Sequence, residues 1–93
     1  METQIIVLKS GAKVLVDAAD FDALALGSYT WYQGAKGKVT CNIKHQRKPL
    51  YIHRLIMQAA TDERVLHVSG DPLDNRRSNL IVTKIKNLLD GVM

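Results

Sequence analysis

The apolar residues of this chain alternate with polar ones over short segments, and this pattern restricts the fold more than any other feature. The segments QIIVL, AKVLVD, KVTCNIK, RVLHV and LIVT each have the length of a strand. Alternation at every second position is typical of strands that bury one face. Turn sequences such as SG, GAKG and SGDP lie between the segments. The sequence therefore predicts short strands joined by turns.

Three short helices are expected in addition to the strands. The segment DAADFDALALG, residues 17–27, predicts one helix, because Asp17 can cap its start and Gly27 can end it. The segment 50–60 begins with a strand pattern and ends with a helical one. KIKNLLDG, residues 84–91, predicts a helix in the C-terminal part. Strands and short helices in this order indicate an α+β fold.

No linker, repeat or low-complexity tract divides the 93 residues, so the chain is interpreted as a single domain, 1–93. Residues 1–60 predict an antiparallel β meander with short helices. Residues 61–93 predict two strands around a structured loop, followed by a helix, which is a ββα-like order. The domain thus has two parts built on one core.

The meander is expected to bury one face only. Val39 and Cys41 alternate with Thr40 and Lys44, so the first pair is assigned to the core and the second to solvent. Trp31 precedes this strand and is also assigned to the core. The polar face of the meander is therefore available for contact with a partner.

Charge is distributed unevenly around this meander. Between Ala23 and Thr61 there is no Asp or Glu, although the whole chain has a net charge of only +4. A surface of one sign suits a phosphate-bearing partner, and a solubilising hairpin is the alternative interpretation. The basic residues of this span are Lys36, Lys38, Lys44, Arg47, Lys48 and Arg54, with His45 and His53.

The remaining composition bears on the location of the protein. Cys41 is the single cysteine, so no internal disulfide can form. The start METQIIVLKSG lacks the pattern of a secretory signal, and no apolar run approaches the length of a membrane span. We expect a cytoplasmic protein with no membrane partner, in the host cytoplasm if a phage encodes it.

The last third carries a more specific pattern. YIHRLIM followed by VLHVSGDPLDNRRSNL resembles the HNH endonucleases of phages and mobile introns, and LVDAADFDALALGSYTWY is similar to the leader of the small homing-type members. The likeness runs from about Val14 to about Asn87. It implies a ββα-metal fold in which Mg²⁺ or Mn²⁺ holds the scissile phosphate. A neutral histidine then accepts a proton from the attacking water.

The resemblance assigns a role to individual positions. His67 matches the general base, and Asn79, twelve residues later, matches the asparagine that orients the motif loop. Asn75 and Ser78 are expected to share the hydrogen bonds of that loop. The metal-binding positions fall on two leucines, Leu66 and Leu88; a shift of one residue in the helix would bring Asn87 to the second position.

Leucine cannot coordinate a cation, and Leu66 is tied directly to His67. Asp71 and Asp74 follow the turn and would need a rearranged loop to replace it. The pattern therefore predicts no metal cofactor and lost or weakened cleavage. An active DNA-nicking endonuclease using Mg²⁺ or Mn²⁺ is one alternative. A small phage-type protein that binds and modulates a host protein is the other.

The leading interpretation is a protein that binds double-stranded DNA. Each assigned residue also has a structural alternative. His67 could be a strand histidine bonded to a carbonyl, and His53 a hydrogen-bonding group beneath the motif. Arg76 and Arg77 could pair with the nearby aspartates instead of phosphate. The expected DNA contacts are Lys36, Lys38, Lys44, Arg47, Lys48, Arg76 and Arg77.

Overall fold

Seven short strands form three separate antiparallel sheets within residues 2–42 and 48–84, which are the residues that the computed structural model describes. The first sheet pairs β1 (Thr3–Val7) with β2 (Lys13–Asp17). The second is a meander of β3 (Tyr32–Gln33), β4 (Val39–Cys41) and β5 (Leu50–Tyr51). The third pairs β6 (Glu63–His67) with β7 (Leu80–Lys84).

Short helical segments connect these strands. The two α-helices are α1 (Ala18–Ala23) and α2 (Ile52–Met57). The 3₁₀ turns are η1 (Leu26–Ser28), η2 (Ala35–Gly37) and η3 (Arg77–Asn79). The described part of the chain is thus a small mixed α+β domain, as the sequence predicted. No helix in it is long and apolar enough to cross a membrane.

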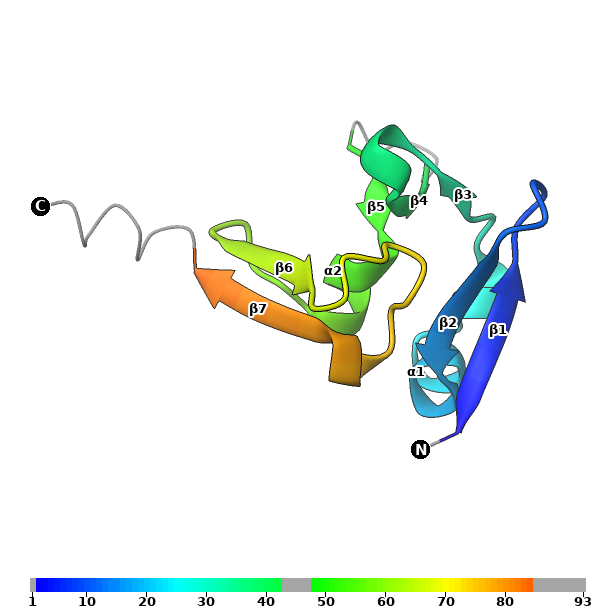
Figure 1. Ribbon diagram of the computed structural model, residues 1–93, viewed down its shortest axis with the longest axis horizontal. Coiled ribbons are helices and arrows are strands. Elements are labelled where there is room, and N and C mark those ends of the chain that lie inside the picture. Colours follow the sequence, from blue (N-terminus) through cyan, green and yellow to red (C-terminus); the bar gives the residue numbers. More distant parts are fainter. Residues whose placement is uncertain (1, 43–47, 85–93) are drawn as a thin grey trace, which may run out of the picture.

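The loop between β6 and β7 lies between the two hairpins (Figure 1). The β6–β7 hairpin is on one side of the molecule with α2 beside it, and the β1–β2 hairpin is on the other side with α1. A parallel bridge between Leu15 of β2 and Asp74 of the loop joins the two sides. Residues distant in sequence therefore meet at this loop.

One apolar core is shared by all three sheets. Val14 and Val16 are completely buried while Leu15, on the opposite face of β2, is only half-buried, which confirms the predicted alternation. Trp31 is buried as predicted, and its indole N–H donates to the Leu26 carbonyl at 2.8 Å. The other core residues are Leu8, Leu26, Val39, Cys41, Ile52, Ile56, Val65 and Leu80.

The helix predicted over residues 17–27 is wrong in its extent. Helix α1 ends at Ala23, Ala25 adopts the left-handed conformation with φ of 49°, and Gly27 lies inside η1. The side chain of Asp17 also makes no capping bond at the start of α1. The break brings Leu26 into the core, where it is fully buried. Tertiary packing here outweighs the local preference for a longer helix.

The expectation of one exposed face on the meander is also wrong at β4. Thr40 is buried like its neighbours Val39 and Cys41 in β4, the middle strand of the meander. Its hydroxyl donates to the Leu50 carbonyl at 3.0 Å, so burial leaves no unpaired hydroxyl. The transition from strand β5 to helix α2 agrees with the prediction for this segment. The predicted helix over residues 84–91 lies outside the described residues, except for Lys84.

Candidate functional site

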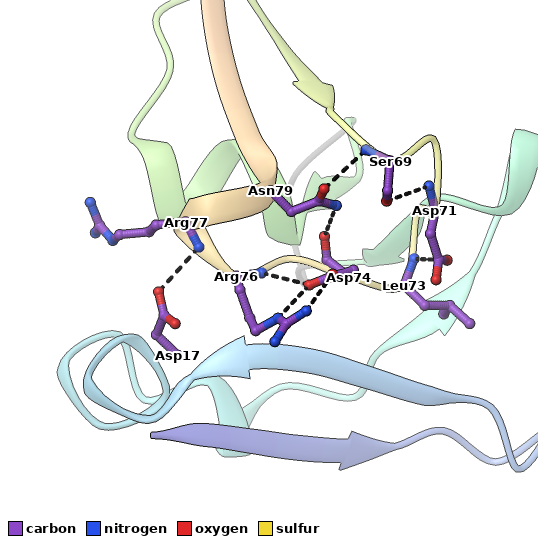
Figure 2. Close-up of polar contacts among 8 residues, drawn as sticks. All are labelled: Asp17, Ser69, Asp71, Leu73, Asp74, Arg76, Arg77 and Asn79. Carbon is purple, nitrogen blue, oxygen red and sulfur yellow. Dashed lines mark hydrogen bonds and ion pairs between the residues drawn. The ribbon is translucent and has the colours of Figure 1, made fainter. Parts of the chain in front are cut away.

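Asn79 holds together the two sides of the loop between β6 and β7 (Figure 2). Its side-chain oxygen accepts the Ser69 N–H at 3.0 Å, and its amide nitrogen donates to the Asp74 carbonyl at 2.9 Å. The Asn79 carbonyl also accepts the Val68 N–H at 2.8 Å. Because Asn79 is buried, these bonds are shielded from competing water. Asn79 therefore fixes the path of the loop after His67.

His67 lies at the end of β6, opposite Leu80 of β7. Its Nε2 is 2.8 Å from the Asn75 side-chain oxygen, so its partner is an amide side chain and not a backbone carbonyl. The Asn75 amide nitrogen donates to the Pro72 carbonyl, which turns its oxygen toward His67. Nε2 therefore carries the hydrogen in neutral His67, and Nδ1 is the atom that can accept a proton.

Asn75 is the most buried polar residue of the loop, with no exposed surface. Its backbone N–H donates to the Leu15 carbonyl at 2.7 Å, which ties the loop to β2. The expectation that Asn75 shares the loop's hydrogen bonds is therefore confirmed. Ser78 is exposed, and its side chain makes no hydrogen bond to the described residues.

His53 lies behind His67 on α2. The two ring centroids are 5.1 Å apart, and only 4% of the His53 surface is exposed. The pKa of His53 is lowered from 6.5 to about 4, chiefly by burial, with smaller contributions from the positive charges of His67, Lys38 and Arg54. Its Nδ1 is buried without a hydrogen-bond partner among the described residues, in contrast to the predicted hydrogen-bonding role.

A cleft of about 550 Å³ lies beside this histidine pair. The whole of strand β6 lines one side of it, and residues of the meander and α2 line the other. On the meander side, the Lys38 ammonium lies 5.8 Å from the Tyr51 ring centroid. The positively charged side chains that border the cleft are Lys36, Lys38, Arg54 and Arg64, and the acid is Glu63.

The charged side chains on the border of the cleft differ in whether they are already bonded within the protein or are exposed to an anion from solution. Arg54 donates to the carbonyls of Ala60 and Glu63, both at 2.6 Å, so it joins α2 to the start of β6. The Glu63 carboxylate accepts the Ala60 N–H at 2.8 Å. Lys36, Lys38 and Arg64 are exposed and form no ion pair with the described carboxylates. These three cations can therefore meet an anion from solution.

Leu66 also borders the cleft, with 46% of its surface exposed. The two aspartates of the following loop are engaged within it: Asp74 binds the Arg76 guanidinium through both oxygens at 2.8 Å, and Asp71 accepts the Leu73 N–H. Residues 2–42 and 48–84 contain no group of three His, Cys, Asp or Glu side chains that could hold a metal ion.

Arg76 and Arg77 both bind carboxylates. The hydrogen bond from Arg76 holds the pKa of Asp74 below its usual range, and the same bond raises the pKa of Arg76. The alternative in which Arg77 pairs with an aspartate of its own loop is wrong in the partner, because Arg77 binds Asp20 of α1. The bond raises the pKa of Arg77.

The predicted DNA contacts fall into separate groups. Lys36 and Lys38 border the cleft, whereas Lys48 lines a second depression with Pro49 and Leu55. Lys44, Arg47, Asn87 and Leu88 lie outside the described residues. Sequence reasoning missed Arg64, although its spacing of two from Leu66 could have placed it on the same strand face.

Comparison with known proteins adds no family to this picture: no protein-family profile, no curated protein and no solved structure matches the chain.

Proposed function

We propose that this chain binds double-stranded DNA on an HNH-endonuclease-like scaffold whose metal-dependent cleavage is lost or weakened. The observation that carries the proposal is the cleft beside His67, with Lys36, Lys38 and Arg64 exposed on its border and no ion-pair partner among the described residues. Unpaired cations around a concave surface attract the phosphate backbone and release its counterions on binding. Nearby positive charge also contributes, after burial, to the lowered pKa of His53.

The arrangement around His67 supports the resemblance to the HNH scaffold. A strand ending in His67, a loop held by Asn79 and a returning strand follow the order expected of the motif. The Nδ1 atom of His67 could accept a proton, but Leu66 supplies no oxygen ligand beside it. Without a metal ion, cleavage loses several kcal/mol of transition-state stabilisation. We infer that the scaffold is retained for binding DNA.

A protein partner is the second candidate, and one observation favours it. Leu66, Val68 and Ile81 are 46%, 61% and 53% exposed, and Leu66 lies directly opposite Ile81 in the β6–β7 hairpin. Exposed apolar side chains that are adjacent on one face mark protein-binding sites more often than isolated ones do. On this alternative the hairpin is the recognition surface and the cleft is secondary.

Fluorescence anisotropy with a labelled DNA duplex tests the proposal over a series of salt concentrations. We expect the logarithm of the affinity to fall linearly with the logarithm of salt, with a slope of about −0.9 per phosphate neutralised. Replacing Lys36, Lys38 and Arg64 by Ala should weaken binding and flatten the slope by up to ~3 units. The control variant replaces Lys9 and Lys13, which are also exposed and belong to the β1–β2 hairpin, outside the cleft lining.

The outcomes separate the candidate functions. Equal losses in the cleft variant and the control variant would contradict a role for the cleft. An absence of salt-dependent binding in the parent would contradict DNA binding altogether and leave the protein-partner candidate.

Incubation of supercoiled plasmid with and without Mg²⁺ or Mn²⁺ tests whether the protein cleaves DNA. Nicking that requires the metal and disappears in His67→Ala would establish an active endonuclease.

A further inference from the structure

Among residues 2–42 and 48–84, no strand pairs with the outer edge of β1. On the far side of β2, the Leu15 N–H donates to the Leu73 carbonyl at 2.8 Å and the Leu15 carbonyl accepts the Asn75 N–H at 2.7 Å. The backbone groups of Leu15 therefore point away from β1. Ile5, directly opposite Leu15, is then in a non-hydrogen-bonded pair, and its own N–H and carbonyl point to the outer edge.

The same alternation holds along the whole strand. The Glu2 carbonyl accepts the Ala18 N–H at 2.8 Å, and the Leu8 N–H donates to the Ala12 carbonyl at 2.9 Å, so even-numbered residues bond inward. The residues that point outward are Thr3, Ile5 and Val7. Among the described residues, the one contact to these groups is a long 3.4 Å bond from the Gln4 side chain to the Ile5 carbonyl.

This edge lacks the features that usually prevent strand pairing. Natural edge strands are protected by lysines, prolines, bulges or covering segments. The segment TQIIV contains no charged residue and no proline. Ile5 and Val7 are 46% and 65% exposed, and the sheet has only two strands, which is marginal for an isolated sheet. The edge is therefore suited to accept another uncharged strand.

We propose that β1 pairs with β1 of a second copy of this chain, antiparallel about a two-fold axis at Ile5. In this register Ile5 faces Ile5 of the second copy, and Thr3 faces its Val7. Every outward N–H and carbonyl of these three residues then meets a complementary group, because an antiparallel pair is itself two-fold symmetric. No like charges face each other within the segment, and the result is a continuous sheet in the order β2–β1–β1–β2.

A strand from a different protein would bond to the same edge, but the register favours the second copy. The outward residue at the centre of the segment is Ile5, with one outward residue on each side. The segment is therefore complementary to itself at full length, with no residue left over. Self-association of this kind does not depend on DNA binding, because β1 contributes no residue to the cleft.

Sedimentation equilibrium over a concentration series, combined with amide hydrogen exchange, tests the proposal. We expect a reversible monomer–dimer equilibrium. As the dimer forms, the amides of Thr3, Ile5 and Val7 should gain protection, whereas those of Gln4 and Ile6 should be protected in both states. A monomer at every concentration would overturn the proposal. A dimer in which the three outward amides stay unprotected would also overturn it.

Charge at position 5 provides a sharper test of the register. Ile5→Lys and Ile5→Glu should each remain monomeric, because two like charges would face each other across the axis. Mixing the two variants should restore a dimer that contains one copy of each. Ser10→Lys, an exposed change in the turn after β1, should dimerise like the parent. Circular dichroism checks that each variant is folded, and a mixture of folded variants that stays monomeric would refute the two-fold register.

Discussion

Arg77 forms a bidentate ion pair with Asp20, in which Nε and Nη2 each lie 2.9 Å from a different carboxylate oxygen. The same Nη2 donates to the Ile56 carbonyl of α2, and the Arg77 backbone N–H donates to Asp17 at 3.1 Å. One residue of the motif loop therefore joins α1, α2 and the end of β2. This geometry makes Arg77 a structural link between the two parts of the domain.

We expect Asp20→Asn to lower the free energy of unfolding by about 1 kcal/mol. Asp20 is buried, but half of the Arg77 side chain is exposed, so water weakens the ion pair. Urea denaturation of the single variants and of the double variant with Arg77→Ala measures the coupling between the two residues. Asp22→Asn is the matched control on the exposed side of α1 and should leave stability unchanged. Independent, additive effects at positions 20 and 77 would contradict the link.

Asn79→Ala should destabilise the protein by about 1–3 kcal/mol, because the Ser69 N–H and the Asp74 carbonyl lose their partner in a buried place. Thermal unfolding measures this effect, with Ser78→Ala at the exposed neighbouring position as control. The salt dependence of DNA binding should stay the same, since Asn79 carries no charge. Unchanged stability in Asn79→Ala would show that the loop does not depend on this side chain.

Stability should fall as the pH drops from about 6.5 toward 4. The pKa of His53 is about 4 in the folded protein and near 6.5 when unfolded, so the unfolded chain binds the proton more readily in this range. The contribution of neutral His53 to the free energy of unfolding is fully present above pH 6.5 and decreases by about 3 kcal/mol as the pH falls toward 4. Chemical denaturation at several pH values should give a flatter profile for His53→Gln than for the parent. Parallel profiles would contradict the depressed pKa.

Arg76→Ala should flatten the salt dependence of DNA binding less than Lys38→Ala does. Arg76 already faces the Asp74 carboxylate, so its removal also releases a negative charge, whereas Lys38 has no acidic partner among the described residues. Anisotropy titrations at several salt concentrations compare the two variants directly. A larger change for Arg76→Ala would place the phosphate contacts at the loop and not at the cleft.

Replacing Lys44, Arg47 and Lys48 together tests the remaining basic residues and should flatten the slope by up to ~3 units if they contact phosphate.

Calorimetric titration with Mg²⁺, Mn²⁺ and Zn²⁺ should show no stoichiometric binding at ordinary affinity. The reason lies in the donor atoms, since Leu66 has none and Asp74 is held by Arg76. Leu66→Asp adds a carboxylate at a half-exposed position on the border of the cleft, so it should fold and serve as the comparison variant. A tight site in the parent that disappears in Asp71→Ala or Asp74→Ala would contradict this expectation.

Local patterns in the sequence predicted much of the secondary structure correctly. Alternation in AKVLVD placed Val14 and Val16 on one face of a strand, and this face is buried; the pattern LYIHRLIM indicated a strand that turns into a helix. Such features depend on residues a few positions apart, whose spacing already determines which face they share. Cys41 was assigned to the core by the same alternation and Trp31 by the usual burial of tryptophan, and both are buried.

Long-range contacts decided what the sequence alone could not. Nothing local indicates that Arg77 binds Asp20, that Leu15 bridges to the loop, or that His53 lies 5.1 Å behind His67. The predicted helix over 17–27 failed because burial of Leu26 outweighs helix propensity, and Thr40 is buried in the middle strand of the meander although alternation predicted an exposed position. Propensities are worth fractions of a kcal/mol per residue, whereas burying one large side chain is worth about 1.5–3 kcal/mol, so packing between distant segments decides where they disagree.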